Sequence, residues 1–394
     1  MSSPTTADDP LVLGESDDRR LLDAFAAAMD AGRTCAVVDP AWPTALREAA
    51  TDQVRSSGIG RERLVLFTSG STGSPRAVVR THRSWVASLD ALTQIIGATP
   101  DDVVHLPGPL TSSLYLYGAW HAARLGARVL VADDDASPAT LVHAVPGQLA
   151  RMVSAPEVWP SLRTVVVAGD LVPAPLRSAA RDIGWRVVEY YGAAELSFVA
   201  WRDDDGPLRP FPGARLRVRD GVLWVASPYL AEGYLPPPGV IKHLVPPPPG
   251  VIKHSDPLPG PLLTRDGWAT VGDLAREVPG GFEVLGRGSA AVTTGGHTVV
   301  AEEVEAALLM VPGVADAVVV GTPDARLGQA VAAVVVLEVA VSRQALDAAL
   351  RRLPAPARPR RWYFAGALPR TAAGKPDRAA MLAAVRAGDV TPLR

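Results

Sequence analysis

The sequence is poor in lysine, cysteine and asparagine. Of its 39 basic residues three are lysines, asparagine is absent, and Cys35 is the single cysteine. One cysteine excludes a disulfide framework and a cysteine-based zinc cluster, and it is typical of the reducing cytoplasm, where we expect this chain to act. No apolar run approaches the ~20 residues of a membrane span. The polar, acidic N-terminus is unlike a signal peptide.

The overall composition is that of an ordinary globular protein. Apolar residues make up 48% of the 394 residues, charged residues 20%, and the net charge is −2. This balance provides no basic surface for nucleic acid and no acidic tail, so nucleic acid is not expected as a partner. The length predicts about two or three domains with buried cores.

Short apolar runs alternate with helical stretches through most of the chain, which predicts an α/β fold. A turn at Asp220–Gly221 separates two alternating segments and predicts a hairpin over residues 214–226. Residues 141–152 are a weak helix candidate, because Pro146–Gly147 interrupts the pattern. Strands are predicted over residues 63–68, 127–132, 163–168 and 186–190.

A second unit is predicted from residue 287 onward. Ser342 is suited to cap one of its helices, and Pro376 lies near the first turn of another. About 100 residues with this alternation predict a small α+β domain. Helices are expected over 301–310, 342–353 and 376–386, and strands over 314–320, 330–339 and 361–365. The domain boundaries expected are therefore 1–286 and 287–394.

A proline-rich repeat lies between these units. Pro236–His243 recurs unchanged as Pro247–His254. Two short copies cannot form a repeat architecture, and their proline density favours an extended, exposed loop. We interpret residues 235–262 as an inserted loop; a role as a ligand for a proline-recognition domain stays open.

Lys375 is the one lysine outside that repeat, in the segment Leu368-Pro-Arg-Thr-Ala-Ala-Gly-Lys375. An ammonium is a compact point charge, whereas guanidinium is a planar fork, so the two are not interchangeable. A position that remains lysine in a chain dominated by arginine is therefore a candidate for contact with a phosphate or carboxylate oxygen.

A loop rich in glycine and hydroxyl groups, Phe67-Thr-Ser-Gly-Ser-Thr-Gly-Ser-Pro-Arg76, follows a predicted strand. Its backbone N–H groups and hydroxyls are suited to phosphate oxygens, and Arg76 adds a positive charge. The spacing differs from both the P-loop and the nucleophile elbow of hydrolases.

Three further segments carry polar residues in turns or at strand ends. Tyr190-Tyr-Gly-Ala-Ala-Glu195 places an aromatic and a carboxylate where ligand crevices of open α/β sheets lie. Asp266–Asp273 ends in a Gly-Asp pair, and Gly286–His297 is followed by the acidic run Glu302-Glu-Val-Glu305.

Taken in order, these motifs resemble the adenylate-forming superfamily of acyl-CoA synthetases, nonribosomal adenylation domains and luciferases. The resemblance extends from about Leu64 to Arg378. It implies a large N-terminal α/β domain with layered sheets and a small, mobile α+β C-terminal domain. It also implies ATP-dependent activation of a carboxylic acid as an acyl-adenylate, with pyrophosphate release and transfer to a thiol of CoA or of a carrier-protein phosphopantetheine.

The resemblance also implies roles for individual residues. Tyr191 would stack on adenine, Glu195 would hold Mg²⁺, and Lys375 would bridge the attacking carboxylate and the α-phosphate. Asp273 would bind the ribose hydroxyls beside Arg287, and Ser289 would be the hinge. The ATP phosphates would be held by Thr68, Ser69, Gly70, Ser71, Thr72, Gly73 and Arg76. The acid would lie against Ala168, Gly169, Gly192 and Ala193, and the thiol would approach past Thr294, Gly295 and Gly296.

Several positions depart from the family pattern. Arg76, Ala194, Val271 and Ser289 replace the usual lysine, threonine, threonine and aspartate or lysine, and the region before residue 67 is shorter than in relatives. Two alternatives stay open: an adenylating enzyme with another nucleophile, such as an amine or nitrite, and a catalytically degenerate nucleotide-binding protein.

The region proposed to contact the acid is mostly small and apolar, which favours an aliphatic or aromatic carboxylic acid. Leu110–Tyr117 contains no aspartate that could pair with an amino-acid ammonium. Since the chain ends soon after Lys375, we expect the acceptor to be free CoA or a stand-alone acyl carrier protein.

Overall fold

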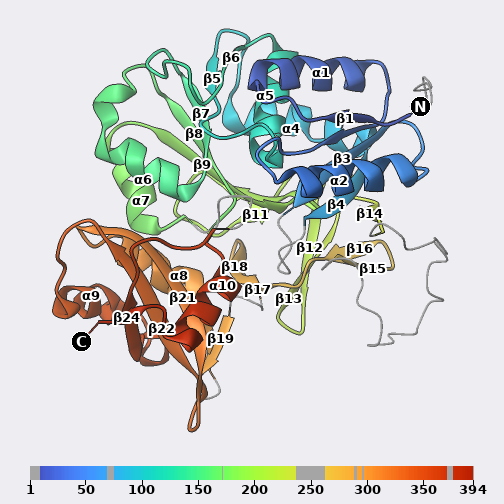
Figure 1. The fold of residues 1–394 in the computed structure, drawn as a ribbon. Helices are drawn as coiled ribbons and strands as arrows, with labels where there is room; N and C mark the ends of the chain where they lie inside the picture. The colour runs from blue at the N-terminus through green and yellow to red at the C-terminus, as the bar shows by residue number, and fades with distance from the viewer. Residues whose placement is uncertain are drawn as a thin grey trace. The chain divides into compact units, whose positions relative to one another are not determined.

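The computed structural model describes residues 9–68, 75–170, 172–236, 262–287, 291–294, 297–370 and 376–393. The backbone divides into two compact units. The first contains residues 1–169, 179–217 and 224–271, and the second contains residues 170–178, 218–223 and 272–394. Several sheets with helices confirm the predicted α/β class (Figure 1).

The first sheet has the order β1-β2-β3-β4-β14. Strands β1, β2 and β3 are parallel, and β4 and β14 continue the sheet in antiparallel pairs. Helix α1 begins after Asp17, whose carboxylate accepts from the N–H groups of Arg19 and Arg20. The bounds are β1 Leu11–Leu13, α1 Asp18–Asp30, β2 Cys35–Val37, α2 Thr44–Ser56, β3 Arg63–Thr68, β4 Arg76–Thr81, α3 His82–Val86, α4 Leu89–Ile96 and β14 Gly233–Tyr234.

The second sheet has the order β11-β10-β9-β8-β7-β5-β6, with β6, β5, β7, β8 and β9 parallel. The crossovers β5–α5–β6 and β7–α6–β8 run in opposite directions along the sheet. Right-handed connections then place α5 and α6 on opposite faces (Figure 1). The bounds are β5 Val103–His105, α5 Ser113–Leu125, β6 Arg128–Leu130, β7 Leu141–Ala144, α6 Pro146–Ser154, β8 Thr164–Val167, α7 Ala174–Asp182, β9 Arg186–Ala193, β10 Ser197–Arg202 and β11 Arg209–Pro210. A short 3₁₀ turn covers Pro156–Val158.

The weak helix predicted over residues 141–152 is wrong in its first part. Leu141–Ala144 is a fully buried strand between β5 and β8, and the helix begins at Pro146. Proline is favoured in a first helical turn because its missing N–H would have no partner there. Pro146 therefore starts the helix that it was expected to interrupt.

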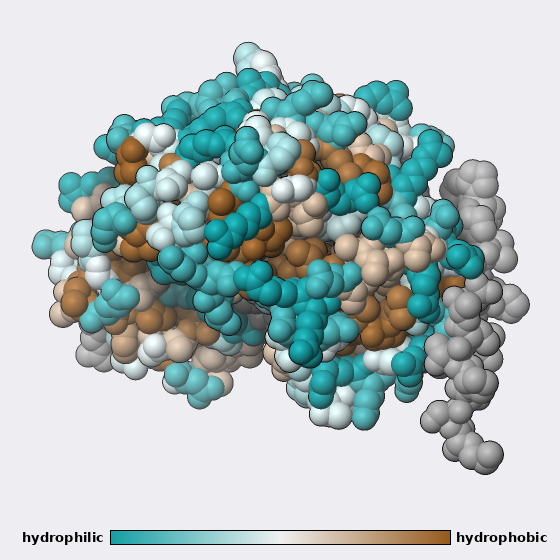
Figure 2. Space-filling model, turned by 90° about the horizontal axis from the view of Figure 1, so that it is seen from above, coloured by the Kyte–Doolittle hydropathy of each residue, from teal (hydrophilic) through white to brown (hydrophobic). Residues whose placement is uncertain are grey.

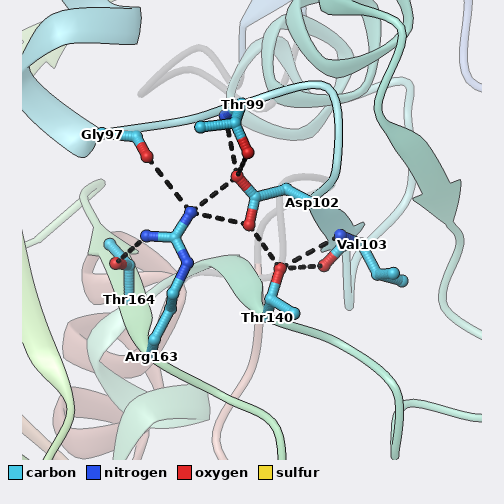
Figure 3. Close-up of polar contacts among 7 residues, drawn as sticks. All are labelled: Gly97, Thr99, Asp102, Val103, Thr140, Arg163 and Thr164. Atoms are coloured by element: carbon cyan, nitrogen blue, oxygen red, sulfur yellow. Dashed lines mark hydrogen bonds and ion pairs between the residues drawn. The ribbon is translucent and has the colours of Figure 1, made fainter.

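A buried carboxylate joins the amino-terminal ends of three strands in the second sheet (Figure 3). Asp102, 3% exposed, precedes β5 and accepts hydrogen bonds from the Thr140 hydroxyl before β7 and from Arg163 before β8. It also accepts from the Thr99 N–H and hydroxyl, and Arg163 donates further to Gly97 O. Ligands of open α/β sheets bind at the carboxyl ends of the strands. This network lies at the opposite end of the sheet.

The predicted hairpin at Asp220–Gly221 is confirmed. Both residues have positive φ, 51° and 76°, as a two-residue type I′ turn requires. The turn joins β12, Arg215–Arg219, to β13, Val222–Ala226. Strands β15, Leu263–Arg265, and β16, Trp268–Thr270, form a second hairpin, in which β16 pairs with β13 through Ala269 and Val225.

The second unit contains an antiparallel pair, β17 and β18, and a sheet built around β21 and β22. Ser342 caps α9 as predicted, accepting from the Ala345 N–H at 3.2 Å. Helix α8 contributes Val304 and Leu308 to the core of this unit. The bounds are β17 Asp273–Val278, β18 Gly281–Arg287, β19 Ala291–Thr294, β20 His297–Val300, α8 Ala301–Leu309, β21 Val314–Asp324, β22 Gly328–Leu337, α9 Arg343–Ala349, β23 Arg361–Phe364, α10 Arg378–Ala387 and β24 Thr391–Pro392. Short 3₁₀ turns cover Leu350–Arg352 and Ala355–Ala357.

The surface shown in Figure 2 intersperses hydrophobic residues among hydrophilic ones. The large hydrophobic side chains exposed in the described part of the chain are dispersed in sequence, from Val86 to Val339. Single exposed hydrophobic residues are normal for globular proteins. Within the described residues, no helix is both long and apolar enough to cross a membrane.

Candidate active site

The carboxyl ends of the neighbouring parallel strands β8 and β9 lie side by side at one end of the second sheet. The strands are parallel, with Val167 opposite Glu189, so Ala168 and Gly169 follow one strand while Tyr191 to Ala193 end the next. Gly169 has φ +91°, and a Cβ there would lie 3.4 Å from a Val145 methyl group. The structure thus places the residues expected to contact adenine and the acid at neighbouring strand ends, where open α/β sheets bind ligands.

A second cluster lies at the reversal of strand order between β5 and β7. The Tyr115 hydroxyl donates to Gln148 Oε1 at 2.8 Å, and Gln148 Nε2 donates to Pro107 O at 2.9 Å. The Tyr115 ring packs so closely on Gly108 that a Cβ there would lie 2.1 Å from it. These contacts join the segment after β5 to the segment after β7.

Gly192 is required by a close approach of the backbone. A Cβ at this position would lie 2.2 Å from Ser197 O, well inside van der Waals contact. Ser197 itself has φ 58°, and the Leu196 N–H donates to Ala193 O at 3.0 Å. The turn between β9 and β10 is therefore tight, and it fixes the backbone that carries Glu195.

Glu195 is 2% exposed and is held by a tyrosine that the sequence motifs did not reveal. The Tyr234 hydroxyl donates to Glu195 Oε1 at 2.8 Å and accepts from the Leu262 N–H at 3.2 Å. Burial, followed by the neighbouring Glu195 carboxylate, raises the pKa of Tyr234 well above its ordinary value. Tyr234 therefore stays protonated and remains a hydrogen-bond donor.

The glycine- and hydroxyl-rich loop is closed at its base by the β3–β4 hairpin, in which Thr68 pairs with Arg76. Ser69, Gly70, Ser71, Thr72 and Gly73 lie outside the described residues. Thr68 Oγ1 is buried and has no hydrogen-bond partner among the described residues. A buried hydroxyl without a partner suits a ligand oxygen, because leaving such a group unsatisfied costs about 1–3 kcal/mol.

Strand β4 follows this loop and pairs with β14, which carries the Tyr234 that binds Glu195. Tyr234 of β14 pairs with Val78 of β4, two residues after Arg76. The charge of Arg76 lowers the pKa of Tyr234, although burial and Glu195 outweigh it. Thr68, Arg76, Tyr234 and Glu195 thus belong to one connected part of the first unit.

Asp273, Arg287 and Thr294 lie in the second unit. Asp273 is 5% exposed and begins β17 directly opposite Arg287 on β18. Gly272 before it has φ +80°, which explains glycine at this turn. Thr294 is 4% exposed and ends β19 opposite Gly328. Ser289, Gly295 and Gly296 lie outside the described residues.

Lys375 also lies outside the described residues, but the chain on both sides of it is firmly held. Arg370 and Pro376 form an isolated antiparallel bridge, and the Asp377 N–H donates to Pro369 O at 2.8 Å. The residues that flank 371–375 are therefore held next to each other.

An ion-pair cluster follows immediately. Arg378 at the start of α10 donates to Glu305 of α8 at 2.6 Å and lies 3.2 Å from Glu302. Burial, the largest cause, raises the pKa of Glu305 to about 8, although Arg378 and the Val319 N–H act in the opposite direction. The acidic run 302–305 was noted in the sequence, but its partner was not.

Mg²⁺ typically binds through one or two carboxylates together with substrate phosphates, keeping water in its other positions. Glu195 fits that pattern as a single buried carboxylate at a strand end. In the described part of the chain, no group of three or more His, Cys, Asp or Glu side chains could hold a metal ion. The residues present therefore suit a cation that arrives with a phosphate ligand.

Comparison with known proteins shows the family to which the chain belongs. Residues 18–235 match the family model described as AMP-binding enzyme, and residues 303–375 match the AMP-binding enzyme C-terminal domain. An uncharacterised acyl-CoA ligase of Bacillus subtilis, YhfT, is 30% identical over 365 residues, covering 84% of this chain and 70% of that protein. A probable 2-succinylbenzoate–CoA ligase of Mycobacterium tuberculosis is 30% identical, covering 81% of this chain and 83% of that protein.

Solved structures share the fold. The o-succinylbenzoate CoA synthetase MenE of Bacillus subtilis, in complex with an acyl-adenylate, has a TM-score of 0.76 at 22% identity, with 95% of this chain and 88% of that chain covered. ATP-bound MatB of Rhodopseudomonas palustris has a TM-score of 0.68 at 22% identity, with 96% and 79% covered. The family models define the class as an AMP-binding enzyme, and its fold is α/β. The chain belongs to the AMP-binding enzyme family.

Proposed function

We propose that this enzyme uses ATP to activate a carboxylic acid as an acyl-adenylate and then transfers the acyl group to the thiol of CoA. The family models support the reaction class, and relatives are named as CoA ligases for 2-succinylbenzoate and for fatty acids. Glu195 is the observation that carries the proposal: a buried carboxylate, held by Tyr234, at the strand ends where the family motifs predict the nucleotide.

In the first step a carboxylate oxygen of the acid attacks the α-phosphorus of ATP, the bond to the bridging oxygen breaks, and pyrophosphate leaves. In the second step the thiol sulfur attacks the acyl carbon, the thiol proton is lost, and AMP leaves. Both partners in the first step are anions, so the protein's contribution is mainly positioning and charge neutralisation.

We assign the residues as the motifs predict. Thr68 to Gly73 and Arg76 contact the phosphates, Tyr191 stacks on adenine, and Asp273 binds the ribose hydroxyls beside Arg287. Lys375 contacts the acid carboxylate and the α-phosphate. Glu195 holds Mg²⁺, which supplies neutralisation of phosphate charge when ATP is bound. Residues 1–286 form the nucleotide- and acid-binding domain, and 287–394 a mobile domain with Ser289 as its hinge.

We infer that the acid is apolar and aliphatic or aromatic. Ala168, Gly169, Gly192 and Ala193 are small, and the neighbouring Tyr115 ring is buried against Gly108. The thiol passes Thr294, Gly295 and Gly296, and a stand-alone acyl carrier protein is the other acceptor that we propose to test. Cys35 is buried and free, compatible with the cytoplasmic location that we propose.

The decisive experiment is acid-dependent exchange of pyrophosphate into ATP with a panel of fatty and aromatic acids, followed by thioester detection with CoA. Lys375→Ala should lower exchange by roughly 10²–10³-fold, as expected for losing one charge directed at developing anions. It should leave thioester formation from supplied acyl-adenylate largely intact.

The chain offers a matched control for that variant, because Lys242 belongs to the proline-rich repeat and to none of the motifs. The repeat lies outside the described residues. Lys242→Ala should retain wild-type exchange. Exchange that persists unchanged in Lys375→Ala would contradict the assignment of Lys375. A wild-type protein that binds ATP but supports no exchange with any acid would favour a degenerate nucleotide-binding protein instead.

A further inference from the structure

Arg80, on β4, is an arginine buried inside the first unit. It is 1% exposed, and its guanidinium lies 5.1 Å from the centre of the Trp85 ring. A buried charge is costly unless it is paired or hydrogen-bonded. None of the described carboxylates forms an ion pair with Arg80. Its hydrogen bonds go to neutral groups, and these must compensate for the burial of its charge.

Its hydrogen bonds go to two distant segments of the chain. One terminal nitrogen donates to Ala194 O at 3.3 Å, and the other donates to Tyr229 O in a short contact. Its Nε donates to the Ser84 hydroxyl at 3.3 Å. Ala194 immediately precedes Glu195, and Tyr229 begins the segment that leads to Tyr234.

These two segments hold Glu195 on both of its sides. The turn between β9 and β10 carries the residue, and the other segment supplies the Ala231 N–H, which donates to Glu195 O at 2.8 Å. The same segment supplies the Tyr234 hydroxyl that binds Oε1. Arg80 therefore donates hydrogen bonds to the carbonyls of both segments that hold Glu195, through Ala194 in one and Tyr229 in the other.

We propose that Arg80 is a positioning residue for Glu195: its guanidinium fork fixes the two segments that aim the carboxylate, and its charge compensates the buried Glu195 carboxylate. This inference rests on the proposed function, because it assigns Arg80 a role at the site where Glu195 would hold Mg²⁺ with ATP. Arg80 acts through Glu195 and contacts no substrate itself.

The electrostatics agree with this role. Burial lowers the pKa of Arg80 to about 10, and Tyr117 and Glu195 raise it. Glu195 is thus the carboxylate that acts on the Arg80 charge, although it is not within ion-pair distance. Ala194 lies 114 residues from Arg80 in the sequence and directly precedes Glu195. Replacing an arginine that served only the core would leave the Glu195 carboxylate unaffected.

The geometry also favours arginine over lysine. The two terminal nitrogens of the planar guanidinium of Arg80 donate to two different carbonyls. The ammonium of a lysine is a single point charge and lacks this fixed fork. Arg80→Lys keeps the charge and loses the fork, and Arg80→Gln loses both. Comparing the two separates charge compensation from the fixing of the two segments.

The test uses the full-length protein and measures binding of Mn²⁺–ATP by electron paramagnetic resonance, together with the Mg²⁺ dependence of acid-driven pyrophosphate exchange. Arg80→Gln should weaken Mn²⁺–ATP binding and raise the half-saturating Mg²⁺ concentration by at least about tenfold, as expected for losing charge-assisted hydrogen bonds. The KM for the acid should stay within about twofold, since Arg80 fixes groups on the metal-binding side. Arg80→Lys should recover part of the loss.

Arg163→Gln is the matched control, because Arg163 holds the buried Asp102 at the opposite end of the second sheet. It should lower the melting temperature without changing the half-saturating Mg²⁺ concentration. If Arg80→Gln does not fold, the Mg²⁺ requirement of Arg80→Lys decides. Wild-type Mg²⁺ dependence in the folded Arg80 variants would overturn the inference while leaving the proposed function intact. Absence of ATP binding and exchange in the wild-type protein would instead overturn the proposed function.

Discussion

The Tyr234 hydroxyl donates a 2.8 Å hydrogen bond to the buried carboxylate of Glu195. The two residues are 39 positions apart and come from different sheets, β14 in the first and the turn after β9 in the second. The contact therefore joins β14, which pairs with the strand that follows the glycine-rich loop, to the turn after the strand that carries Tyr191.

Replacing Tyr234 with Phe removes this donor and keeps the ring. Hydrogen bonds to charged groups contribute about 1.5–3 kcal/mol, so we expect the half-saturating Mg²⁺ concentration for pyrophosphate exchange to rise roughly tenfold or more. Tyr229→Phe is the control, because the Tyr229 hydroxyl donates to Pro212 O and not to Glu195. Equal Mg²⁺ curves for the two variants would show that Tyr234 does not support metal binding.

Replacing Gly192 with Ala should destabilise the protein and lower exchange activity together. The new Cβ would lie 2.2 Å from Ser197 O, so the turn carrying Glu195 must shift. Overpacking of this kind typically costs about 1–3 kcal/mol in unfolding free energy. The change is measured by chemical denaturation and by exchange assays at saturating ATP.

Gly147→Ala provides the comparison for Gly192. A Cβ at Gly147 meets nothing within 4 Å, and the residue lies in the first turn of α6. Its replacement should be neutral or stabilise by up to about 1 kcal/mol. A Gly192→Ala protein as stable and active as Gly147→Ala would mean that the turn adjusts freely.

Sequence reasoning predicted the elements whose signals are local. The Asp220–Gly221 turn and the Ser342 cap depend on neighbouring residues only, and both are confirmed. The strand at Leu141–Ala144 was missed because a short apolar run has no period that separates strand from helix, and its burial comes from β5 and β8.

The candidate site shows the same limit. Glu195 was found because it stands in a recognisable motif, whereas Tyr234 and Arg80 belong to none. Their importance arises from pairing between β4 and β14 and from carbonyls more than 100 residues away. No local pattern marks a buried arginine in a chain that uses arginine for nearly all its basic residues.

Asp102 should stabilise the protein at neutral pH and lose that effect in acid. Burial alone would raise the pKa of Asp102, but hydrogen bonds from Thr140, Thr99 and Arg163 outweigh it and lower the pKa below 3.8. A carboxylate with a depressed folded-state pKa contributes stability above its unfolded pKa and loses it as pH falls through the folded value.

The corresponding variant is Asp102→Asn. Because Arg163 is about half-exposed, we expect a loss of about 1–3 kcal/mol at pH 7, less than for a fully buried pair. The difference from the wild type should shrink as pH falls below about 4. The adjacent, exposed Asp101→Asn should change little. A stability difference independent of pH would show that the charge of Asp102 is not what the network stabilises.

Glu305 should have the opposite pH dependence. Burial raises its pKa from 4.5 to about 8 in the folded protein. A group with a raised folded-state pKa contributes stability fully below its unfolded pKa and loses it as pH rises through the folded value, here between about 4.5 and 8. Glu305→Gln mimics the protonated side chain at every pH. The variant should therefore match the wild type near pH 4.5 and gain relative melting temperature as pH rises to 9.

The control for Glu305 is Glu283→Gln, which removes an exposed carboxylate paired with Arg276 on β17. Exposed ion pairs contribute little, so its melting temperature should run parallel to the wild type across this pH range. If Glu305→Gln instead loses stability relative to the wild type as pH rises, the carboxylate is ionised at neutral pH. The ion pair with Arg378 would then outweigh burial in setting its pKa.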